Sequence, residues 1–235
     1  MRARLSVLLT LAAAVAVGAW LFGWWSSRME RPAEAPTAAL PLNLDELRER
    51  AARGDAEAQC QLGLAHSRGQ GGKPDYAEAA RWYRQAAERG HARAQAALGE
   101  LYEAGQGVPR DEAEAARWYR RAAEQGDAFA QYSLAVLYLL GKGVPRDLPE
   151  AINWYQRAAA QGHALAQYNL GLRHRDGDGV ACDPVEAYKW LSLAAAQGLA
   201  DAAEARDALE RNLTRPQLKE ARQRMEAFTA PHRRP

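Results

Sequence analysis

The feature that most constrains this chain is a period of 36 residues in its sequence. Five residue types recur at this spacing through most of the chain. Self-similarity at a fixed period of about 20–50 residues is typical of solenoids, in which each repeat buries its apolar face against its neighbours. The recurring residues are Trp82, Trp118, Trp154 and Trp190; Gly54, Gly90, Gly126, Gly162 and Gly198; Gln59, Gln95, Gln131 and Gln167; Leu62, Leu98, Leu134 and Leu170; and Asp75, Asp111, Asp147 and Asp183. We therefore divide the chain into four units, residues 55–90, 91–126, 127–162 and 163–198.

The first half of each unit is predicted to be a helix. In the second unit, Ala94, Leu98 and Tyr102 stand at i, i+4 and i+8 and therefore share one helix face. Gly105 follows this stretch, at a place where glycine ends helices in the left-handed conformation. A loop with the sequence GQGVPR then leads to the second half of the unit.

The second half of each unit is predicted to be another helix. Asp111 is its expected N-cap, and Glu114 is expected to complete a capping box, in which each side chain accepts from the other residue's backbone N–H. Ala115 and Trp118 share the apolar face, and Gly126 ends the helix. The same Asp-x-x-Glu spacing occurs at Asp75/Glu78, Asp147/Glu150 and Asp183/Glu186. Each unit is therefore a helical hairpin.

The stretch ARWYRQAAERG, residues 80–90, is nearly repeated in the second unit. We expect Trp82 to be a core spacer between layers and Tyr83 to pack at the layer edge. Arg81 and Arg84 are replaced in the third unit, so we expect them on a solvated outer face, with Arg84 and Glu88 supporting each other at i, i+4. The most repeated stretch is thus expected to be framework.

The units need caps, because a terminal hairpin leaves one apolar face unpaired. Residues 43–54 align with a second helix but carry Glu46 where tryptophan stands elsewhere, which indicates a polar N-terminal capping helix. Residues 199–228 are predicted to form a C-terminal capping helix pair, with a capping box at Thr214-x-x-Gln217, followed by a tail at 229–235. The predicted fold class is an all-α, right-handed α-solenoid of antiparallel helix pairs.

The N-terminal segment differs from the rest of the chain. Residues 5–25 carry no charge, follow a basic stretch at residues 1–4 and end in Trp24 and Trp25. About 20 apolar residues span a bilayer as a helix, and positive charge favours a cytoplasmic N-terminus. We expect a single-pass inner-membrane anchor, a Pro/Ala-rich linker at 26–42 and a periplasmic repeat domain. The alternative is a cleaved signal peptide, which would release a soluble periplasmic adaptor.

Residues with metal-binding or catalytic chemistry are few and scattered. We interpret the five histidines, His66, His91, His163, His174 and His232, as structural or surface residues. A calcium loop beginning at Asp176 would lack the required ligands at later positions. Cys60 and Cys182 lie three units apart, roughly 30 Å, which is too far for a disulfide. We predict no metal, no cofactor and no catalytic residue, and therefore no enzyme.

The repeated pattern resembles the Sel-1-like repeat, a relative of the tetratricopeptide repeat. The second unit carries the motif residues Ala94, Leu98, Gly99, Tyr102, Gly105, Gly107, Val108, Asp111, Ala115, Trp118, Tyr119, Ala122, Ala123 and Gly126. The resemblance covers about residues 43–228 and implies stacked antiparallel helix pairs and a role in protein–protein interaction. The first unit departs from it at QGGKP, and the fourth unit at His174 and Leu191. The paired cysteines of the cysteine-rich branch are missing, so no enzyme activity transfers from it.

Positions that vary between units are free to bind a partner. The third, seventh, tenth and fourteenth positions of the first helix vary and share a face, which the resemblance places on the concave side. These residues are Glu57, Gln61, Leu64 and Arg68; Arg93, Ala97, Glu100 and Ala104; Phe129, Ser133, Val136 and Leu140; and Leu165, Asn169, Leu172 and Asp176. The predicted partner site comprises Phe129, Ser133, Val136, Leu140, Leu165, Asn169, Leu172, Arg93 and Glu100. The alternative is that the C-terminal cap covers some of these side chains.

The sequence therefore predicts a membrane-anchored periplasmic scaffold or adaptor that binds or regulates another envelope protein. The net charge of +2 disfavours a dedicated nucleic-acid-binding protein. A second alternative is a module that binds cell-wall glycan or polysaccharide, which would need exposed aromatic side chains.

Overall fold

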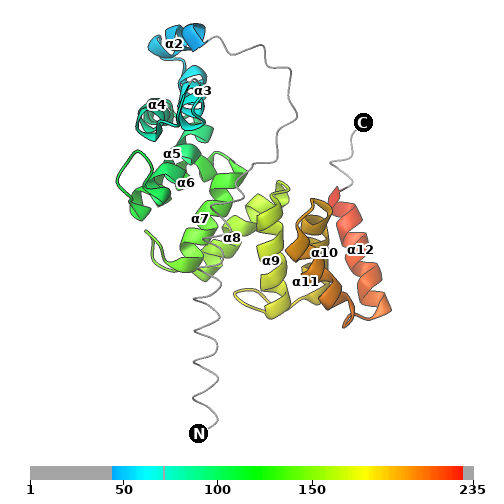
Figure 1. Ribbon diagram of the computed structural model, residues 1–235. Helices are drawn as coiled ribbons and strands as arrows, with labels where there is room; N and C mark the ends of the chain where they lie inside the picture. Colours follow the sequence, from blue (N-terminus) through cyan, green and yellow to red (C-terminus); the bar gives the residue numbers. More distant parts are fainter. Residues whose placement is uncertain (1–43, 71, 230–235) are drawn as a thin grey trace. The chain divides into compact units, whose positions relative to one another are not determined.

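The computed structural model describes residues 44–70 and 72–229, and all regular elements in these ranges are α-helices (Figure 1). The predicted anchor, at residues 5–25, and the linker, at 26–42, lie outside the described residues. Within the described part, the search for a membrane-spanning helix finds none. The described residues belong to one compact unit of the chain.

From α2 to α11, each helix packs against the next in chain order (Figure 1). Helix α10 also contacts α12. The helices are α2 (Leu44–Ala52), α3 (Ala56–Ser67), α4 (Tyr76–Glu88), α5 (Ala92–Ala104), α6 (Glu112–Glu124), α7 (Ala128–Leu140), α8 (Leu148–Ala160), α9 (Ala164–Asp176), α10 (Pro184–Ala196), α11 (Ala200–Glu210) and α12 (Arg215–Thr229). The four predicted hairpins are α3/α4, α5/α6, α7/α8 and α9/α10, so the all-α repeat solenoid is confirmed, with α2 at its start and α11 and α12 at its end.

Two glycines per loop are needed for different reasons. Gly105 ends α5 with φ 68°, in the left-handed conformation that the sequence predicts. Gly143 also has a positive φ, and a Cβ atom there would lie 2.0 Å from the carbonyl oxygen of Glu112. The loop after α7 therefore rests on the first turn of α6, in the preceding unit, and only glycine permits that approach.

The predicted capping box forms only by half. Asp111 Oδ1 accepts from the backbone N–H of Glu114 at 3.0 Å, as expected. The backbone N–H of Asp111, however, donates to the carbonyl of Tyr102 at 3.0 Å, which closes the hairpin. The Glu114 side chain is thereby released and pairs with Arg117. The same backbone bond joins Asp75 to His66, Asp147 to Tyr138 and Asp183 to His174.

The C-terminal pair shows the complete capping box. The Thr214 N–H donates to Gln217 Oε1 at 2.9 Å, and the Gln217 N–H donates to Thr214 Oγ1 at 3.4 Å. Phe228 of α12 meets Trp190 of α10 edge-on, with ring centroids 5.3 Å apart. The predicted cap is thus docked on the fourth unit.

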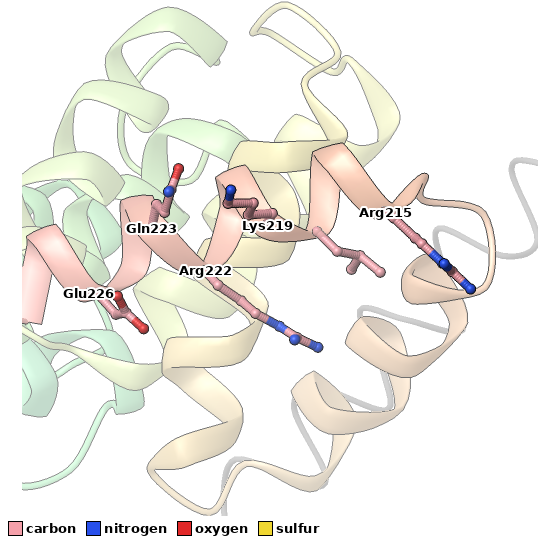
Figure 2. Close-up of a pocket in the computed structure, with 6 residues that line it drawn as sticks. Arg215, Lys219, Arg222, Gln223 and Glu226 are labelled. Atoms are coloured by element: carbon pink, nitrogen blue, oxygen red, sulfur yellow. The ribbon is translucent and has the colours of Figure 1, made fainter.

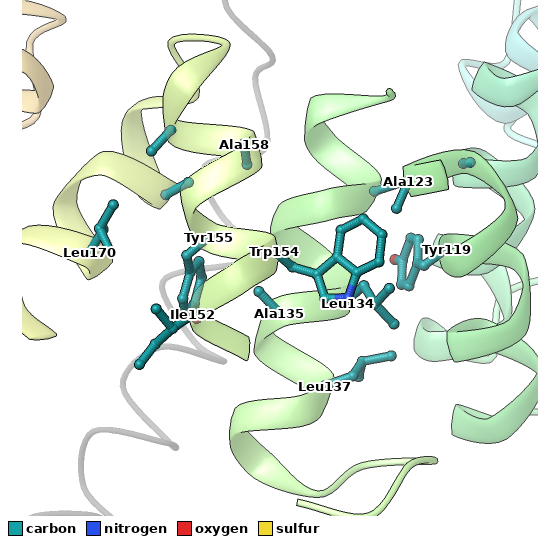
Figure 3. Close-up of a cluster of buried hydrophobic side chains, with 14 of the residues drawn as sticks. Tyr119, Ala123, Leu134, Ala135, Leu137, Ile152, Trp154, Tyr155, Ala158 and Leu170 are labelled. Atoms are coloured by element: carbon teal, nitrogen blue, oxygen red, sulfur yellow. The ribbon is translucent and has the colours of Figure 1, made fainter. Parts of the chain in front are cut away.

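Three of the four repeat tryptophans are buried in the core as expected, and Trp82 is half-buried. The expectation that the neighbouring tyrosine packs at the layer edge is wrong, because the tyrosine is the more deeply buried of the two. Tyr119 is fully buried, whereas Trp118 keeps 8% of its surface exposed and is covered by the Arg121 guanidinium, 4.6 Å from the ring centroid. A cation also covers the other repeat tryptophans, in the pairs Arg81–Trp82, Arg157–Trp154 and Lys189–Trp190. The tyrosine is deeper because the first helix of the next unit packs over it, as Figure 3 shows for the surroundings of Tyr119 and Tyr155.

The expected pairing of Arg84 with Glu88 is wrong. Arg84 is half-buried, and its guanidinium donates to the hydroxyl of Tyr102, in the next unit, at 2.8 Å. Arg120 donates to Tyr138 in the same way. Arg84 and Arg120 therefore join consecutive units. The i, i+4 spacing within one helix could not predict these contacts with another helix.

Buried glutamines join three consecutive helices in units two, three and four. Gln95 of α5 donates to the carbonyl of Ala87, in the last turn of α4, at 3.0 Å. Its own side-chain oxygen accepts from Gln125, at the end of α6, at 2.7 Å. Two further units repeat this relay: Gln131 binds Ala123 and Gln161, and Gln167 binds Ala159 and Gln197. Each relay gives a second donor to a carbonyl in the last turn of a helix, which also accepts from the backbone N–H of the glycine three residues further on.

The relay predicts a large effect of one polar substitution. Gln131→Ala removes both side-chain bonds and leaves the Gln161 amide without its acceptor, while the Ala123 carbonyl keeps the Gly126 N–H, so we expect a loss of about 1–3 kcal/mol in the free energy of unfolding. Urea denaturation followed by circular dichroism measures it. Gln156→Ala, on the exposed side of α8, is the matched control and should change stability by less than about 0.5 kcal/mol. Equal effects of the two substitutions would contradict the relay.

Candidate functional site

The predicted partner site lies on the first helices of three units, α5, α7 and α9. Its accessible members are Arg93, Glu100, Phe129, Val136, Leu140, Leu165, Asn169 and Leu172, which we call the first-helix face. Leu140 is 51% exposed and is the exposed large hydrophobic residue of the described chain. Arg93 is exposed, and the other six are half-buried.

Ser133 is the exception among the predicted site residues. It retains only 8% of its surface, so it lies beneath the first-helix face. Phe129 connects the face to the core, because its ring meets Tyr119 edge-on at 6.1 Å and 75°. A substitution at Phe129 would therefore disturb both surface and core, whereas Leu140 reports on the surface alone.

The C-terminal cap leaves part of this face accessible. Helices α11 and α12 pack mainly on α10. Burial is the main cause that raises the pKa of Tyr168, on α9, and the charges of Asp201 and Glu204, on α11, raise it further. The cap therefore lies next to α9 at Tyr168. Leu165 and Leu172 nevertheless remain only half-buried.

Two buried tyrosines form the floor between consecutive first helices. Tyr119 of α6 contacts both Glu103 of α5 and Phe129 of α7. Tyr155 of α8 lies 5.9 Å from Tyr132 of α7, ring centroid to ring centroid. Burial raises the pKa of Tyr132 to about 12, so its hydroxyl is neutral at physiological pH. The floor is thus aromatic, and the Tyr132 hydroxyl beside it carries no charge at physiological pH.

Two charged side chains that sequence reasoning missed flank these tyrosines. The Tyr119 hydroxyl donates to Glu103 Oε2 at 2.9 Å, and burial raises the pKa of Glu103. Arg173 of α9 pairs with Asp178, while its buried Nε has no hydrogen-bond partner. Glu103 stands at the thirteenth position of its unit and Arg173 at the eleventh. Both positions adjoin the four variable positions of the first helix that define the predicted partner site. The thirteenth position also varies between units, as Ser67, Glu103, Leu139 and Arg175, and this signal could have identified Glu103.

Two of the five histidines have structural positions in the described part of the chain, and His232 lies outside it. His91 and His163 are N-caps, whose Nδ1 atoms accept from the backbone N–H of Ala94 and Ala166 at 3.2 and 3.3 Å. The His163 ring also stacks on Tyr132 at 4.7 Å. Among residues 44–70 and 72–229, no three histidines, cysteines or acids form a group that could hold a metal ion. Cys60 is buried and Cys182 is exposed, and no disulfide joins the two.

A separate open pocket of about 380 Å³ lies on α12 (Figure 2). Arg215, Leu218, Lys219, Arg222, Gln223 and Glu226 line it. None of these residues belongs to the first-helix face. Leu218 also packs against the small core cluster beneath α12, so the helix is amphipathic with a mainly basic outer side.

Comparison with known proteins defines the family. A model described as the Sel1 repeat matches residues 56–91, 92–127, 128–163 and 164–199, which are more than half of the chain. These matches follow the units deduced from the sequence, displaced by one residue. The chain belongs to the Sel1 repeat family, whose members generally mediate protein–protein interactions.

Solved structures support the same assignment. The chain is similar to a Sel1 repeat protein from Oxalobacter formigenes, with 31% identity over 77% of this chain and 78% of that chain, and a TM-score of 0.65. It is also similar to a protective antigen with an SLR fold from uropathogenic Escherichia coli, with 28% identity over 80% of this chain and a TM-score of 0.54. This chain covers 48% of that antigen. The curated proteins compared with the chain include no match.

The half-buried N-cap His163 predicts a pH dependence of stability. Burial lowers its pKa to about 4 from an ordinary value of 6.5, so the unfolded chain binds the proton first as the pH falls. The contribution of neutral His163 is complete above about pH 6.5 and is lost as the pH falls toward 4. His163→Asn keeps a capping side chain without the titrating ring. Urea denaturation at about pH 7 and pH 4.5 should show a smaller loss of stability in the variant; equal losses would contradict the assignment.

Proposed function

We propose that this chain is a membrane-anchored periplasmic scaffold that binds an envelope protein through the first-helix face. The membership in a family of interaction proteins supports binding of a protein, and it also supports a non-enzymatic role. The single observation that carries the choice of surface is the exposed Leu140, which continues the half-buried apolar residues Val136 and Phe129 along α7. Accessible apolar residues that lie over buried aromatic side chains are typical of a protein–protein interface.

The face is divided by charge along the array. Its α5 part carries Arg93 and Glu100, and its α7 part is apolar. Rim charges steer and orient a partner, while buried apolar contacts supply most of the affinity. This arrangement supports a partner segment that lies across both helices, with its apolar part over α7.

The membrane anchor rests on residues 5–25, which contain no charged side chain. Their length fits a bilayer-spanning helix. The alternative, a soluble adaptor released by signal cleavage, predicts a shorter mature chain. N-terminal sequencing of the chain recovered from membrane and soluble fractions distinguishes the two.

Binding of glycan has less support. Carbohydrate-binding modules would need accessible aromatic rings, but Trp118, Trp154 and Trp190 are buried in the core. Cations lie over all three indoles.

A matched pair of substitutions tests the proposed face. Leu140 and Ala160 are both exposed and both end their helices, α7 and α8. We expect Leu140→Glu to reduce capture of the envelope partner at least about tenfold, because it places a charge in the apolar contact. Ala160→Glu should leave capture unchanged, and both variants should stay within about 1 kcal/mol of the original stability.

The readout is a pull-down by the full-length chain from detergent-solubilised envelopes, with and without glycan digestion. Unchanged capture by Leu140→Glu would contradict the proposed face. Capture that disappears on glycan digestion would favour the glycan alternative.

A further inference from the structure

The pocket on α12 lies along one side of that helix (Figure 2). Its lining residues recur every three or four positions, so they share a helix face. They are Arg215, Leu218, Lys219, Arg222, Gln223 and Glu226, which we call the α12 face. The hollow of about 380 Å³ is large enough to receive side chains of another molecule.

Leu218 gives this pocket an apolar base. It is half-buried and packs against the small core cluster formed by Val185, Tyr188 and Ala221. Helix α12 is docked on α10, so this base is supported from below by the fourth unit. The α12 face therefore combines one accessible apolar side chain with charged side chains around it.

The cations of the α12 face are largely unused within the described part of the chain. Arg215 and Lys219 are exposed, and neither has an acidic partner within 4 Å among the described residues. The Arg222 guanidinium lies 3.6 Å from Glu210 of α11, and 60% of the Arg222 side chain stays exposed. The face thus presents three positive charges, two of which have no ion pair.

The docking of α12 on the array does not explain these cations. Arg224 serves that purpose, since its guanidinium lies 3.2 Å from both Asp183 and Glu186 of the fourth unit and also pairs with Glu220. Arg215 and Lys219 are like charges at i, i+4, a spacing that slightly destabilises a helix. They therefore weaken α12 and contribute nothing to holding the cap in place.

Positive charge is concentrated at this end of the chain. Residues 211–229 carry five basic and two acidic side chains, a net charge of +3, whereas the whole chain carries +2. The remaining residues therefore have no excess of positive charge. The α12 face is a local basic surface on a nearly neutral protein.

We propose that the α12 face binds an acidic segment of a partner protein. Carboxylates of this segment pair with Arg215, Lys219 and Arg222, and one of its apolar side chains packs on Leu218. Charge complementarity carries the proposal. An apolar centre with a polar rim is the usual anatomy of a protein interface. The α12 face shares no residue with the first-helix face, so the proposal goes beyond the proposed function and does not depend on it.

The face favours a protein segment over other anionic occupants. Gln223 and Glu226 stand at its C-terminal end, where Glu226 would repel a polyphosphate or an anionic lipid surface. Membrane binding by charge typically uses about 4–8 cations, and this face has three. The chain's own residues 26–42 carry two arginines and two glutamates, so they offer no net negative charge.

The order of charges also gives the bound segment a direction. Arg215 and Glu226 are eleven residues apart, which is about 16 Å along the helix axis. Acids of the segment are expected over the N-terminal half of α12, and neutral or basic residues over Glu226. A segment of about 12 residues is long enough to cover this distance in either a helical or an extended form.

Selection from a peptide library tests this chemistry without a known partner. The probe is a phage-displayed library of random peptides of about 12 residues. It is selected on the full-length chain, held in detergent by an N-terminal tag, after removal of phage that bind the Lys219→Glu variant. Affinities of synthetic selected peptides are then measured by fluorescence anisotropy. The matched control is Lys73→Glu, at an exposed lysine between α3 and α4.

We expect the selected peptides to be enriched in aspartate and glutamate around an apolar residue. Their affinity should fall about tenfold or more with Lys219→Glu, because attraction becomes repulsion, and should not change with Lys73→Glu. Replacing one acid of the peptide by lysine should weaken binding to the original chain and restore binding to Lys219→Glu. Both variants change exposed residues, and circular dichroism checks that both remain folded.

Three results would overturn the inference. The first is a selection without acidic enrichment, or equal effects of Lys219→Glu and Lys73→Glu. The second is acidic peptides whose affinity falls with Leu140→Glu but not with Lys219→Glu, since they would occupy the first-helix face and leave the proposed function standing. The third is binding of phosphatidylglycerol in mixed micelles that Lys219→Glu abolishes, when no acidic peptide is selected, because it would assign the face to lipid.

Discussion

The buried glutamine relay is the interaction on which the rest of the structure depends. Stacked hairpins made largely of alanine slide easily, because small side chains fix no register. Gln95 and its equivalents remove that freedom by binding the last turn of the preceding helix and accepting from the end of the following one. Because these amides are almost fully buried, a shift of one hairpin would leave several polar groups unpaired, at a cost of about 1–3 kcal/mol each.

In the first unit, one of the two glutamines of the relay is replaced by another residue. Arg89 stands in the first unit where Gln125, Gln161 and Gln197 stand in the others. Gln59 still donates to the Ala51 carbonyl, but its buried Oε1 has no partner. The N-terminal end of the array is therefore less tightly interlocked than units two to four. The proposed partner surface lies on those three units, where a fixed register holds α5, α7 and α9 in place.

Much of the fold could be predicted from the sequence, because its determinants are local. Capping aspartates and left-handed glycines act within a few residues, so their spacing locates the hairpins. Interactions between units could not be assigned in this way. Trp118 and Tyr119 are adjacent in sequence, and only the helix packed over them decides that the tyrosine is the deeper one. The glutamines were visible as a periodic signal, but their partners were not.

The candidate site shows the same division. Comparison of the units identified Leu140 and its neighbours as variable positions of one helix face, which needs only helical geometry. It did not predict that Ser133 would be buried, since that depends on how α6 and α8 pack against α7. Glu103 was not predicted either, because the contact that distinguishes it is a hydrogen bond from Tyr119, on another helix. The structure thus adds to the sequence mainly the contacts made across helices.

The central claim is that the array meets its partner through the first-helix face. Site-specific photo-cross-linking in living cells tests it most directly, with benzoylphenylalanine placed at position 140 or, as the control, at position 160. The account predicts a discrete adduct of higher mass from position 140 and none from position 160. An adduct from position 160 without one from position 140 would contradict it.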